Sequence, residues 1–310
     1  MTEYLIGTGG WAYFHVPGLH PLVAYSKAFN FAEVNSTFYQ IPSLKEVEKW
    51  RKLVPPDFQF TVRANRAITH RYKLRPVQEV FETFETMKQI CATLNVDFLH
   101  FQTPPSLTFT EASVKDLRTF LASANVGKLR LALEVRGENS AKLPSELVKT
   151  MQDYNMVHSV DLSRGETPAY KSDTLYSRLF GKGQHNIYQP TDGELEEIDR
   201  KALSGNFEKV VMSFHFVRMY KDAARLKIYK ETGKFPPVTK STGISSLEEV
   251  LREDAQFPST KQELIHGQGW KLFDLTKEER VHTSDLLQEL PERTYDTLDE
   301  VIAALSSTVR

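Results

Sequence analysis

The stretch of sequence that decides the fold is VQEVFETFETMKQICATLNVDFLHFQ, residues 77–102. From Val77 to Leu94 its apolar side chains recur every three or four residues, as in an amphipathic helix. Its last part, Phe98–Gln102, is a short apolar run that ends in a polar residue, which is typical of a buried strand. The segment therefore predicts a helix that leads directly into a strand.

The same unit recurs along the first 240 residues. Helix-like segments alternate with eight short apolar runs, which are Tyr4–Gly7, Phe31–Asn35, Phe58–Arg63, Phe98–Gln102, Leu129–Val135, Met156–Asp161, Leu175–Phe180 and Val210–Phe216. Eight alternating strands and helices predict an α/β fold, a closed (β/α)8 TIM-like barrel. An open doubly wound sheet is the alternative, but no strand is followed by the GxGxxG turn of that fold.

The chain changes character after a helix predicted over Lys221–Thr232. Gly233 and the following Phe235-Pro236-Pro237 favour a boundary there. The segments 245–249 and 258–264 are typical of helix starts, and 297–305 of a last helix. We therefore expect a TIM-like barrel over residues 1–237 and a small acidic helical domain over 238–310.

Composition and charge restrict the class of protein. The 310 residues are 40% hydrophobic and 25% charged, which excludes a disordered or collagen-like chain. The single cysteine, Cys91, cannot form an internal disulfide, and the sequence lacks a signal peptide and a membrane span, so we expect a cytoplasmic protein without membrane contact. Residues 241–310 hold fourteen Asp/Glu and seven Lys/Arg, against 26 and 32 in residues 1–240. The basic part can attract an anionic ligand.

Polar residues at the ends of the predicted strands indicate where a functional site lies, because a TIM-like barrel carries its site at the carboxyl ends of its strands. Side chains two apart on a strand share a face, so Glu33 and Asn35 lie together, as do Glu134 and Arg136. The strand-end residues are Glu33, Asn35, Arg63, Gln102, Glu134, Arg136, Asp161, Arg178 and His215. His100 and His158 lie inside apolar runs, where a histidine is more often part of the core.

Buried carboxylates require partners, and the three strand-end arginines are the obvious ones. Two interpretations remain open: an ion-pair network that only stabilises the barrel, or an anion pocket in which arginines bind phosphate or carboxylate and a carboxylate or histidine transfers a proton. The basic segment from Arg63 to Arg75, with His70 and Tyr72, suits contact with a phosphate backbone or is a solvated loop. A divalent metal bound by Glu33, Glu134, Asp161 or His215 is a further option, although no metal-ligand motif occurs.

Five strand-end motifs together resemble the domain-of-unknown-function family 72. These are Gly7-Thr8-Gly9-Gly10-Trp11, Glu33–Tyr39 with Pro42, Phe60–Ala64 with Ile68-Thr69-His70, Phe101–Ser106 and Leu133–Gly137. The resemblance covers residues 1–240 in order and implies a TIM-like barrel, but no established reaction. The sequence departs from the family's pattern at Arg63, at Gly137–Ser140 and around His215, which indicates a subgroup with altered chemistry. Residues 257–264 and 290–297 resemble, more loosely, the small helical family 2795.

The leading hypothesis from sequence is a hydrolase of a phosphate-containing substrate, such as a nucleic-acid phosphodiester, with or without a metal. Here Arg63, Arg136 and Arg178 hold the anion, Glu33 and Glu134 act as base or metal ligand, and His70 or His215 handles a proton. Asn35, Gln102 and Asp161 complete the expected substrate-binding set. The alternatives are a binding protein for a small anion or nucleic acid, masked by its acidic tail, and a sugar-phosphate isomerase or lyase. The sequence leaves the oligomeric state open.

Overall fold

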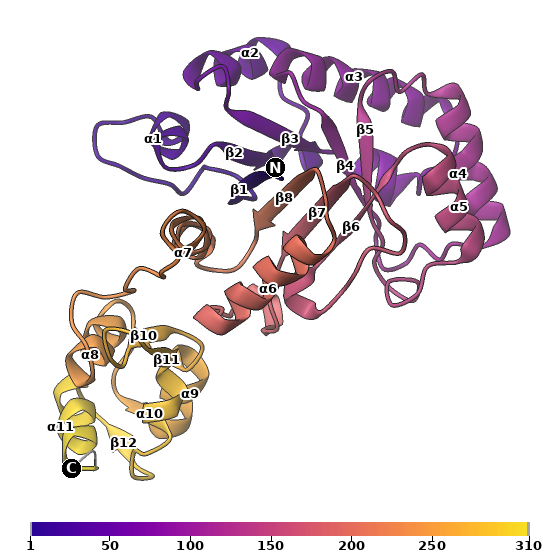
Figure 1. The fold of residues 1–310 in the computed structure, drawn as a ribbon. Helices are drawn as coiled ribbons and strands as arrows, with labels where there is room; N and C mark the ends of the chain where they lie inside the picture. Colours follow the sequence, from indigo (N-terminus) through magenta and orange to yellow (C-terminus); the bar gives the residue numbers. More distant parts are fainter. Residues whose placement is uncertain (1, 309–310) are drawn as a thin grey trace. The chain divides into compact units, whose positions relative to one another are not determined.

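The computed structural model describes residues 2–308 and divides into two compact units. The first comprises the chain up to Phe180 together with Arg200–His215, and the second comprises Gly181–Asp199 and the chain from Phe216 onward. Figure 1 labels the elements of both units, which are described separately below. Helix α6 (Asp192–Ser204) begins in the second unit and ends in the first.

The first unit contains a closed barrel of eight parallel strands, which confirms the predicted fold class. Each strand pairs with the next one along the chain, and β8 closes the barrel on β1, with Glu3 opposite Lys209 and Thr8 opposite Phe214. The strands are β1 (Glu3–Thr8), β2 (Phe31–Val34), β3 (Gln59–Arg63), β4 (Phe98–Gln102), β5 (Arg130–Glu134), β6 (Val157–Val160), β7 (Thr174–Leu179) and β8 (Lys209–Phe214).

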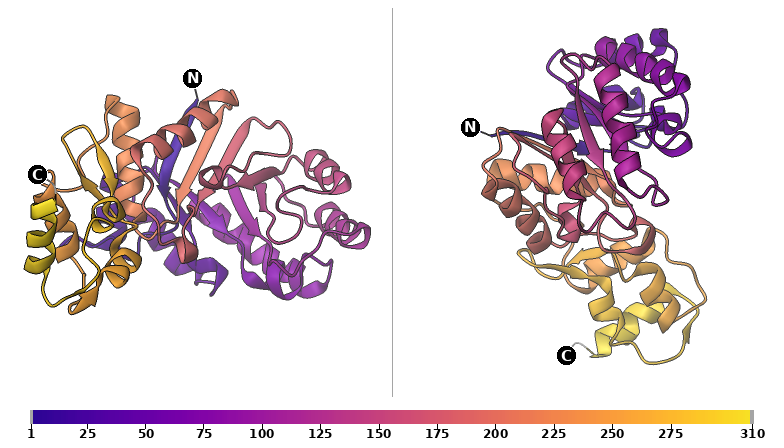
Figure 2. Two further views of the ribbon diagram at one scale, coloured as in Figure 1. Left: turned by 90° about the horizontal axis from the view of Figure 1, so that it is seen from below. Right: turned by 90° about the vertical axis from the view of Figure 1, so that its right-hand side faces the viewer.

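Helices lie outside these strands, as Figures 1 and 2 show. They are α1 (Pro21–Ala28), α2 (Leu44–Leu53), α3 (Gln78–Leu94), α4 (Glu111–Ser123) and α5 (Ser145–Asp153). Helix α3 buries Phe84, Met87 and Cys91, and burial raises the pKa of the Cys91 thiol to about 12, so this cysteine packs rather than reacts. No α-helix separates β6 from β7, which are joined through the short turn η3 (Leu162–Arg164).

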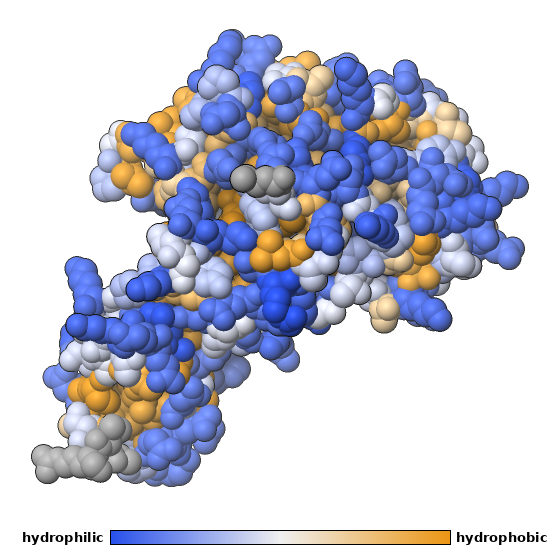
Figure 3. Space-filling view, viewed as in Figure 1, coloured by the Kyte–Doolittle hydropathy of each residue, from blue (hydrophilic) through white to orange (hydrophobic). Residues whose placement is uncertain are grey.

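Alternation along the strands divides the interior of the barrel into an apolar half and a polar half. A buried apolar cluster is formed by Leu5, Phe31, Phe98, Ala132, Val157, Tyr176 and Val211. Two residues further along six of these strands stand Glu33, His100, Glu134, Ser159, Arg178 and Ser213, all buried. Side chains two apart share a face of a strand, so both sets point inward and the polar set lies nearer the carboxyl ends. The outer surface is mainly hydrophilic in the view of Figure 3.

The second unit has a core of its own. Its helices are α7 (Met219–Thr232), α8 (Ile244–Arg252), α9 (Lys261–Gln268), α10 (Thr283–Leu287) and α11 (Leu298–Thr308). Two antiparallel strand pairs, β10 (Leu272–Asp274) with β11 (Arg280–His282) and β9 (Ser259–Thr260) with β12 (Thr294–Tyr295), were not expected from the sequence. Strands of two or three residues are too short to produce a periodic pattern. Leu247, Phe273, Leu287, Tyr295 and Val301 are fully buried there.

Buried polar side chains connect distant segments within the second unit. The Asp192 carboxylate accepts from Arg225 Nη2 and from Arg280 Nε, each at 2.5 Å. Gln189 donates to Asp222 at 3.3 Å and accepts from the Leu272 amide at 2.9 Å. Residues on both sides of position 237 therefore share one network, while the domain boundary predicted there stays a prediction. None of the helices within residues 2–308 has the length and apolar character that crossing a membrane requires.

Candidate functional site

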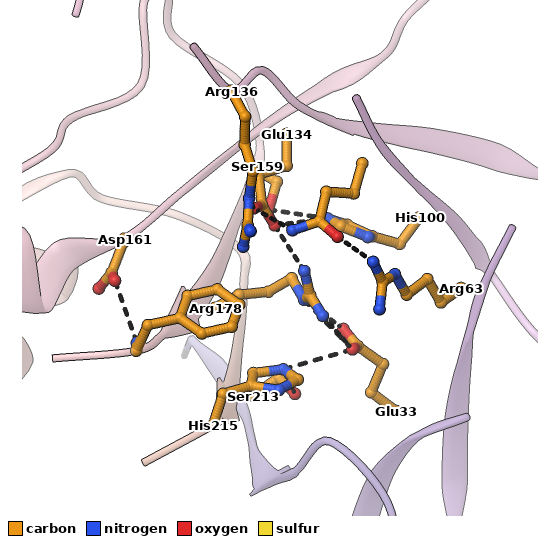
Figure 4. A network of polar contacts seen from close by, with 12 residues as sticks. Glu33, Arg63, His100, Glu134, Arg136, Ser159, Asp161, Arg178, Ser213 and His215 are labelled. Carbon is orange, nitrogen blue, oxygen red and sulfur yellow. Dashed lines mark hydrogen bonds and ion pairs between the residues drawn. The ribbon is translucent and has the colours of Figure 1, made fainter. Parts of the chain in front are cut away.

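The carboxyl end of the barrel joins most of the predicted site residues into one hydrogen-bonded network, drawn in Figure 4. Parallel strands end at the same rim, so side chains far apart in sequence meet there. The connected residues are Glu33, Asn35, Arg63, Gln102, Glu134, Arg136, Arg178 and His215. Asp161 and His70 lie beside this network and are described below.

Arg178 lies at the centre of the network and is 1% exposed. Its Nη2 and Nε atoms donate to Glu33 at 2.9 to 3.2 Å, and its Nη1 atom donates to Glu134 Oε2 at 2.7 Å. The Tyr176 hydroxyl also donates to Glu33, at 2.9 Å. Burial alone would raise the pKa of Glu33, but Arg178 and then His215 hold it well below its usual range. Glu33 is therefore a poor general base, and all three nitrogens of Arg178 are engaged with carboxylates.

Glu134 is the second centre of the network and links three strands. Its Oε1 atom accepts from Gln102 Nε2 at 2.7 Å and from Arg136 Nε at 2.6 Å. Gln102 in turn accepts from Arg63 Nη2, and Arg63 Nη1 donates to Asn35 at 2.9 Å. Burial opposes ionisation, but Arg178 and Arg136 lower the pKa of Glu134 far below its usual range. Glu134 is thus an anchor for arginines rather than a base.

Two histidines contact the carboxylates. His215 Nε2 lies 3.3 Å from Glu33 Oε1, and its ring stacks on Phe180. His100 Nε2 lies 3.2 Å from Ser159 Oγ and 3.5 Å from Glu134 Oε2. Burial and Arg178 lower the pKa of both, that of His100 to about 3, so both are neutral near pH 7. The sequence placed His100 in the core, and its spacing of two from Gln102 is the signal that would have assigned it to the network as well.

A cleft of about 290 Å³ opens beside Glu134 and Arg178. Other lining residues are Pro105, Arg136, Ser140, Asp161, Arg164, Glu166 and Phe180. Asp161 Oδ2 accepts from the Phe180 amide at 3.0 Å, and Glu166 accepts from the Asp161 amide at 2.7 Å. Burial raises the pKa of Asp161 to about 6 and also raises the pKa of Glu166. The sequence predicted Asp161 here but missed Arg164 and Glu166, which lie on the η3 turn and just beyond it, outside the strand pattern.

His70 lies on the loop after β3, where the structure forms a π-helical turn at Ala67–Arg71. Its Nδ1 atom is 2.9 Å from Thr69 Oγ1, and its ring meets the Phe38 ring edge-on at 4.8 Å. The same Phe38 ring carries the Arg63 guanidinium 3.6 Å from its centroid. Burial first, and then Arg63, Arg136 and Arg66, lower the pKa of His70. His70 therefore belongs to the arginine-rich side of the site.

The predicted metal ligands do not fit a metal ion. Within residues 2–308 no group of three or more His, Cys, Asp or Glu side chains is arranged to hold one. The Glu33 and Glu134 oxygens accept from arginines, and Asp161 accepts from two backbone amides and the Ser163 hydroxyl. A metal ion would have to displace these donors.

The fold and the site define a TIM-like barrel whose carboxyl end carries arginines that are held by buried carboxylates. Residues 5–229 match the family described as protein of unknown function DUF72, and the chain belongs to this family. The UPF0759 protein YunF of Bacillus subtilis is 26% identical over 188 residues, which are 56% of this chain and 66% of YunF. The UPF0759 protein YecE of Escherichia coli K12 is 32% identical over 69 residues, 22% of this chain and 25% of YecE. The chain thus spans less than two thirds of either curated relative.

Solved structures of the family have the same fold. A DUF72 protein of Thermotoga maritima superposes with a TM-score of 0.60 at 20% identity, covering 74% of this chain and 99% of that one. A DUF72 protein of Enterococcus faecalis gives 0.58 at 16% identity, covering 75% and 98%. At these identities the likeness concerns the fold alone. The looser C-terminal resemblance to family 2795 stays a prediction.

Proposed function

We propose that this DUF72 barrel is a hydrolase that acts on a small phosphate ester in the cleft beside Asp161. One observation carries the proposal: two partly exposed guanidinium groups, those of Arg136 and Arg164, line the same cleft as two carboxyl groups of raised pKa, those of Asp161 and Glu166. The guanidinium pair suits a phosphoryl group, and Asp161, whose pKa is raised to about 6, suits proton transfer near neutral pH. This retains the predicted reaction class and moves its base from Glu33 and Glu134 to Asp161.

Arg136 is the main anion-binding residue in this proposal. Its side chain is 40% exposed, and Glu134 holds it through Nε alone. Its terminal amino groups donate to no other residue of the described chain 2–308, so they are available to phosphate oxygens. Arg164 lines the same cleft with a side chain that is 47% exposed. Planar guanidinium forks match phosphate geometry and neutralise the charge that develops during phosphoryl transfer.

Asp161 supplies the general base. With a pKa of about 6 it is mostly ionised at pH 7, yet still basic enough to accept a proton from water. The water oxygen forms the new bond to phosphorus, the ester P–O bond breaks, and the leaving oxygen takes a proton from solvent, while Glu166 holds the Asp161 backbone amide. The size of the cleft favours a small phosphodiester or the end of a nucleic-acid strand over a duplex.

The test is hydrolysis of a panel that contains bis(p-nitrophenyl) phosphate, a phosphodiester whose charge is constant across the pH range. We expect the rate to rise with pH through about 6 and then level off, because the ionised form of Asp161 is the active one. Asp161→Asn should lower kcat by about 100-fold or more and abolish the pH dependence. Asp57→Asn alters an exposed residue before the amino end of β3 and should leave activity unchanged.

The opposite outcomes have clear meanings. Binding of phosphate esters without release of phosphate or alcohol would support the alternative of a binding protein. Conversion of a sugar phosphate with its phosphate retained would support an isomerase or lyase. Full activity of Asp161→Asn would overturn the assignment of the base.

A further inference from the structure

Arg63 lies across the mouth of the barrel from the cleft and is not used by the proposed reaction. It is 8% exposed, and two of its nitrogens are engaged, Nη1 with Asn35 and Nη2 with Gln102. Its third nitrogen, Nε, is buried without a hydrogen-bond partner within the described residues. A buried charged donor without an acceptor is costly, and a ligand that accepts from it recovers this cost.

The relay between Arg63 and Arg136 consists of only two side chains. Arg63 donates to Gln102, Gln102 donates to Glu134, and Glu134 accepts from Arg136. The relay places one guanidinium at each of its ends. Because Gln102 contributes no charge and Glu134 is already shared with Arg178, the relay leaves both ends with positive charge. The site therefore presents a guanidinium at two separate positions.

His70 lies beside the Arg63 position and strengthens it. Both side chains contact the Phe38 ring, and the charge of Arg63 acts on His70. His70 uses Nδ1 towards Thr69, and in the chain from residue 2 to 308 its Nε2 atom makes no hydrogen bond. The pKa of His70 is lowered by burial and then by Arg63, Arg136 and Arg66, as expected where positive charges converge. An anion held by Arg63 can also accept a hydrogen bond from this imidazole.

We propose that the substrate carries two anionic groups, one held by Arg136 in the cleft and the other by Arg63 and His70 across the mouth of the barrel. This deepens the proposed function and rests on it. A phosphate-terminated dinucleotide and a sugar bisphosphate share this chemistry. Arg66 and Arg71 are exposed on the same loop and add a positive field to the second position.

The experiment compares binding of matched ligands that differ by one phosphate. The pairs are the dinucleotide TpT with 5′-phosphorylated pTpT, and fructose 6-phosphate with fructose 1,6-bisphosphate, measured by calorimetry on the full chain. We expect the member with two phosphate groups in at least one pair to bind about 10-fold or more tightly, the effect of one further charge-assisted hydrogen bond. The pair that shows the preference identifies the ligand as a nucleotide or a sugar.

Variants test whether Arg63 and His70 cause the preference for the ligand with the additional phosphate. Arg63→Gln and His70→Asn should reduce the preference towards 1, whereas Arg63→Lys keeps a cation and should retain part of it. Arg136→Gln should instead weaken both members of a pair. Arg75→Gln, an exposed arginine of the same loop, is the control and should change nothing. Melting temperatures confirm that each variant is folded. If Arg63→Gln does not fold, His70→Asn still tests the second anion position.

Two results separate the inference from the function on which it rests. Equal, measurable binding of both members in both pairs would overturn the second anion position and leave the phosphate cleft intact. Binding by none of the four ligands, together with no hydrolysis, would overturn both proposals. Arg63→Gln protein that keeps the full preference would also contradict the assignment.

Discussion

Arg178 shows how a buried charge is accommodated in this protein. Both Glu33 and Glu134 contact it, and neither the guanidinium nor Glu33 reaches solvent to any extent. Two carboxylates this close would repel each other, and Arg178 compensates for both. Arg178 matters for stability mainly because its removal would leave the buried carboxylates of Glu33 and Glu134 without a compensating charge.

Arg178→Met should therefore destabilise the protein by about 3–5 kcal/mol at neutral pH, measured by urea unfolding. Arg178 depresses the folded-state pKa of both Glu33 and Glu134, so their contribution to stability is present above the unfolded-state pKa of about 4.3 and is lost as the pH falls through the folded-state pKa. The difference between wild type and Arg178→Met should consequently shrink on acidification below about pH 4.

An exposed ion pair provides the comparison for this prediction. Arg118 Nη2 lies 2.6 Å from Asp153 Oδ2, and the two side chains are 34% and 43% exposed. Arg118→Met should cost less than about 1 kcal/mol. If Arg178→Met cost no more than Arg118→Met, the central ion pairs would be unimportant for folding, and the low pKa of Glu33 would need another cause.

At the scale of elements, the ends of β1 and β8 meet with almost no space between them. A Cβ atom on Gly9 would lie 2.2 Å from His215 Cε1, so only glycine allows the histidine to reach Glu33. Gly7 is equally restricted, because its Cβ would lie 2.1 Å from the Phe31 carbonyl oxygen. The Gly-rich motif at the end of β1 is thus explained by close packing rather than by phosphate binding.

Gly9→Ala should displace His215 from Glu33 and cost about 1–3 kcal/mol, the range for overpacking. Gly193→Ala is a matched control, because a Cβ there meets nothing within 4 Å, and it should be neutral or slightly stabilising. Urea unfolding measures the cost, and NMR titration of His215 measures the displacement. An unchanged His215 signal in Gly9→Ala would show that the backbone at the end of β1 moves away and leaves His215 in place, which would contradict the prediction.

The sequence predicted the eight strands and the shared faces of Glu33 with Asn35 and of Glu134 with Arg136, because apolar runs and the two-residue alternation are local properties. It could not predict which carboxylates pair with arginines, since Glu33 meets Arg178 only after the barrel closes. The same limit explains why Glu33 and Glu134 were expected to act as general bases or metal ligands. Glu166 was missed because its role depends on a hydrogen bond from the Asp161 amide, which no periodic pattern reveals.

At the scale of the whole molecule, composition and contacts divide the chain differently. Charge and the prolines near 237 favour a boundary there, yet residues 216–237 group with the C-terminal segment. The connection is specific: Asp192 holds Arg225 from one side of position 237 and Arg280 from the other. A boundary read from composition alone does not take such bonds into account.

A fragment of residues 1–237 should therefore melt at a lower temperature than the full chain. Truncation removes Arg280 from Asp192 and the Leu272 amide from Gln189, and each lost hydrogen bond costs about 0.5–3 kcal/mol. Full-length Arg280→Met tests the first loss without truncation, and calorimetry measures both. A fragment that melts with the full chain would support an independent domain ending at 237.

The division of the barrel interior into an apolar half and a polar half affects how the protein can change during evolution. The apolar layer near the amino ends specifies the barrel, whereas the ligand would meet only the last inward side chains of the strands and the loops beyond them. Mutations in these last positions can therefore redirect specificity while the scaffold persists. Relatives of this protein need not share a substrate, and a protein engineer would randomise these few positions first.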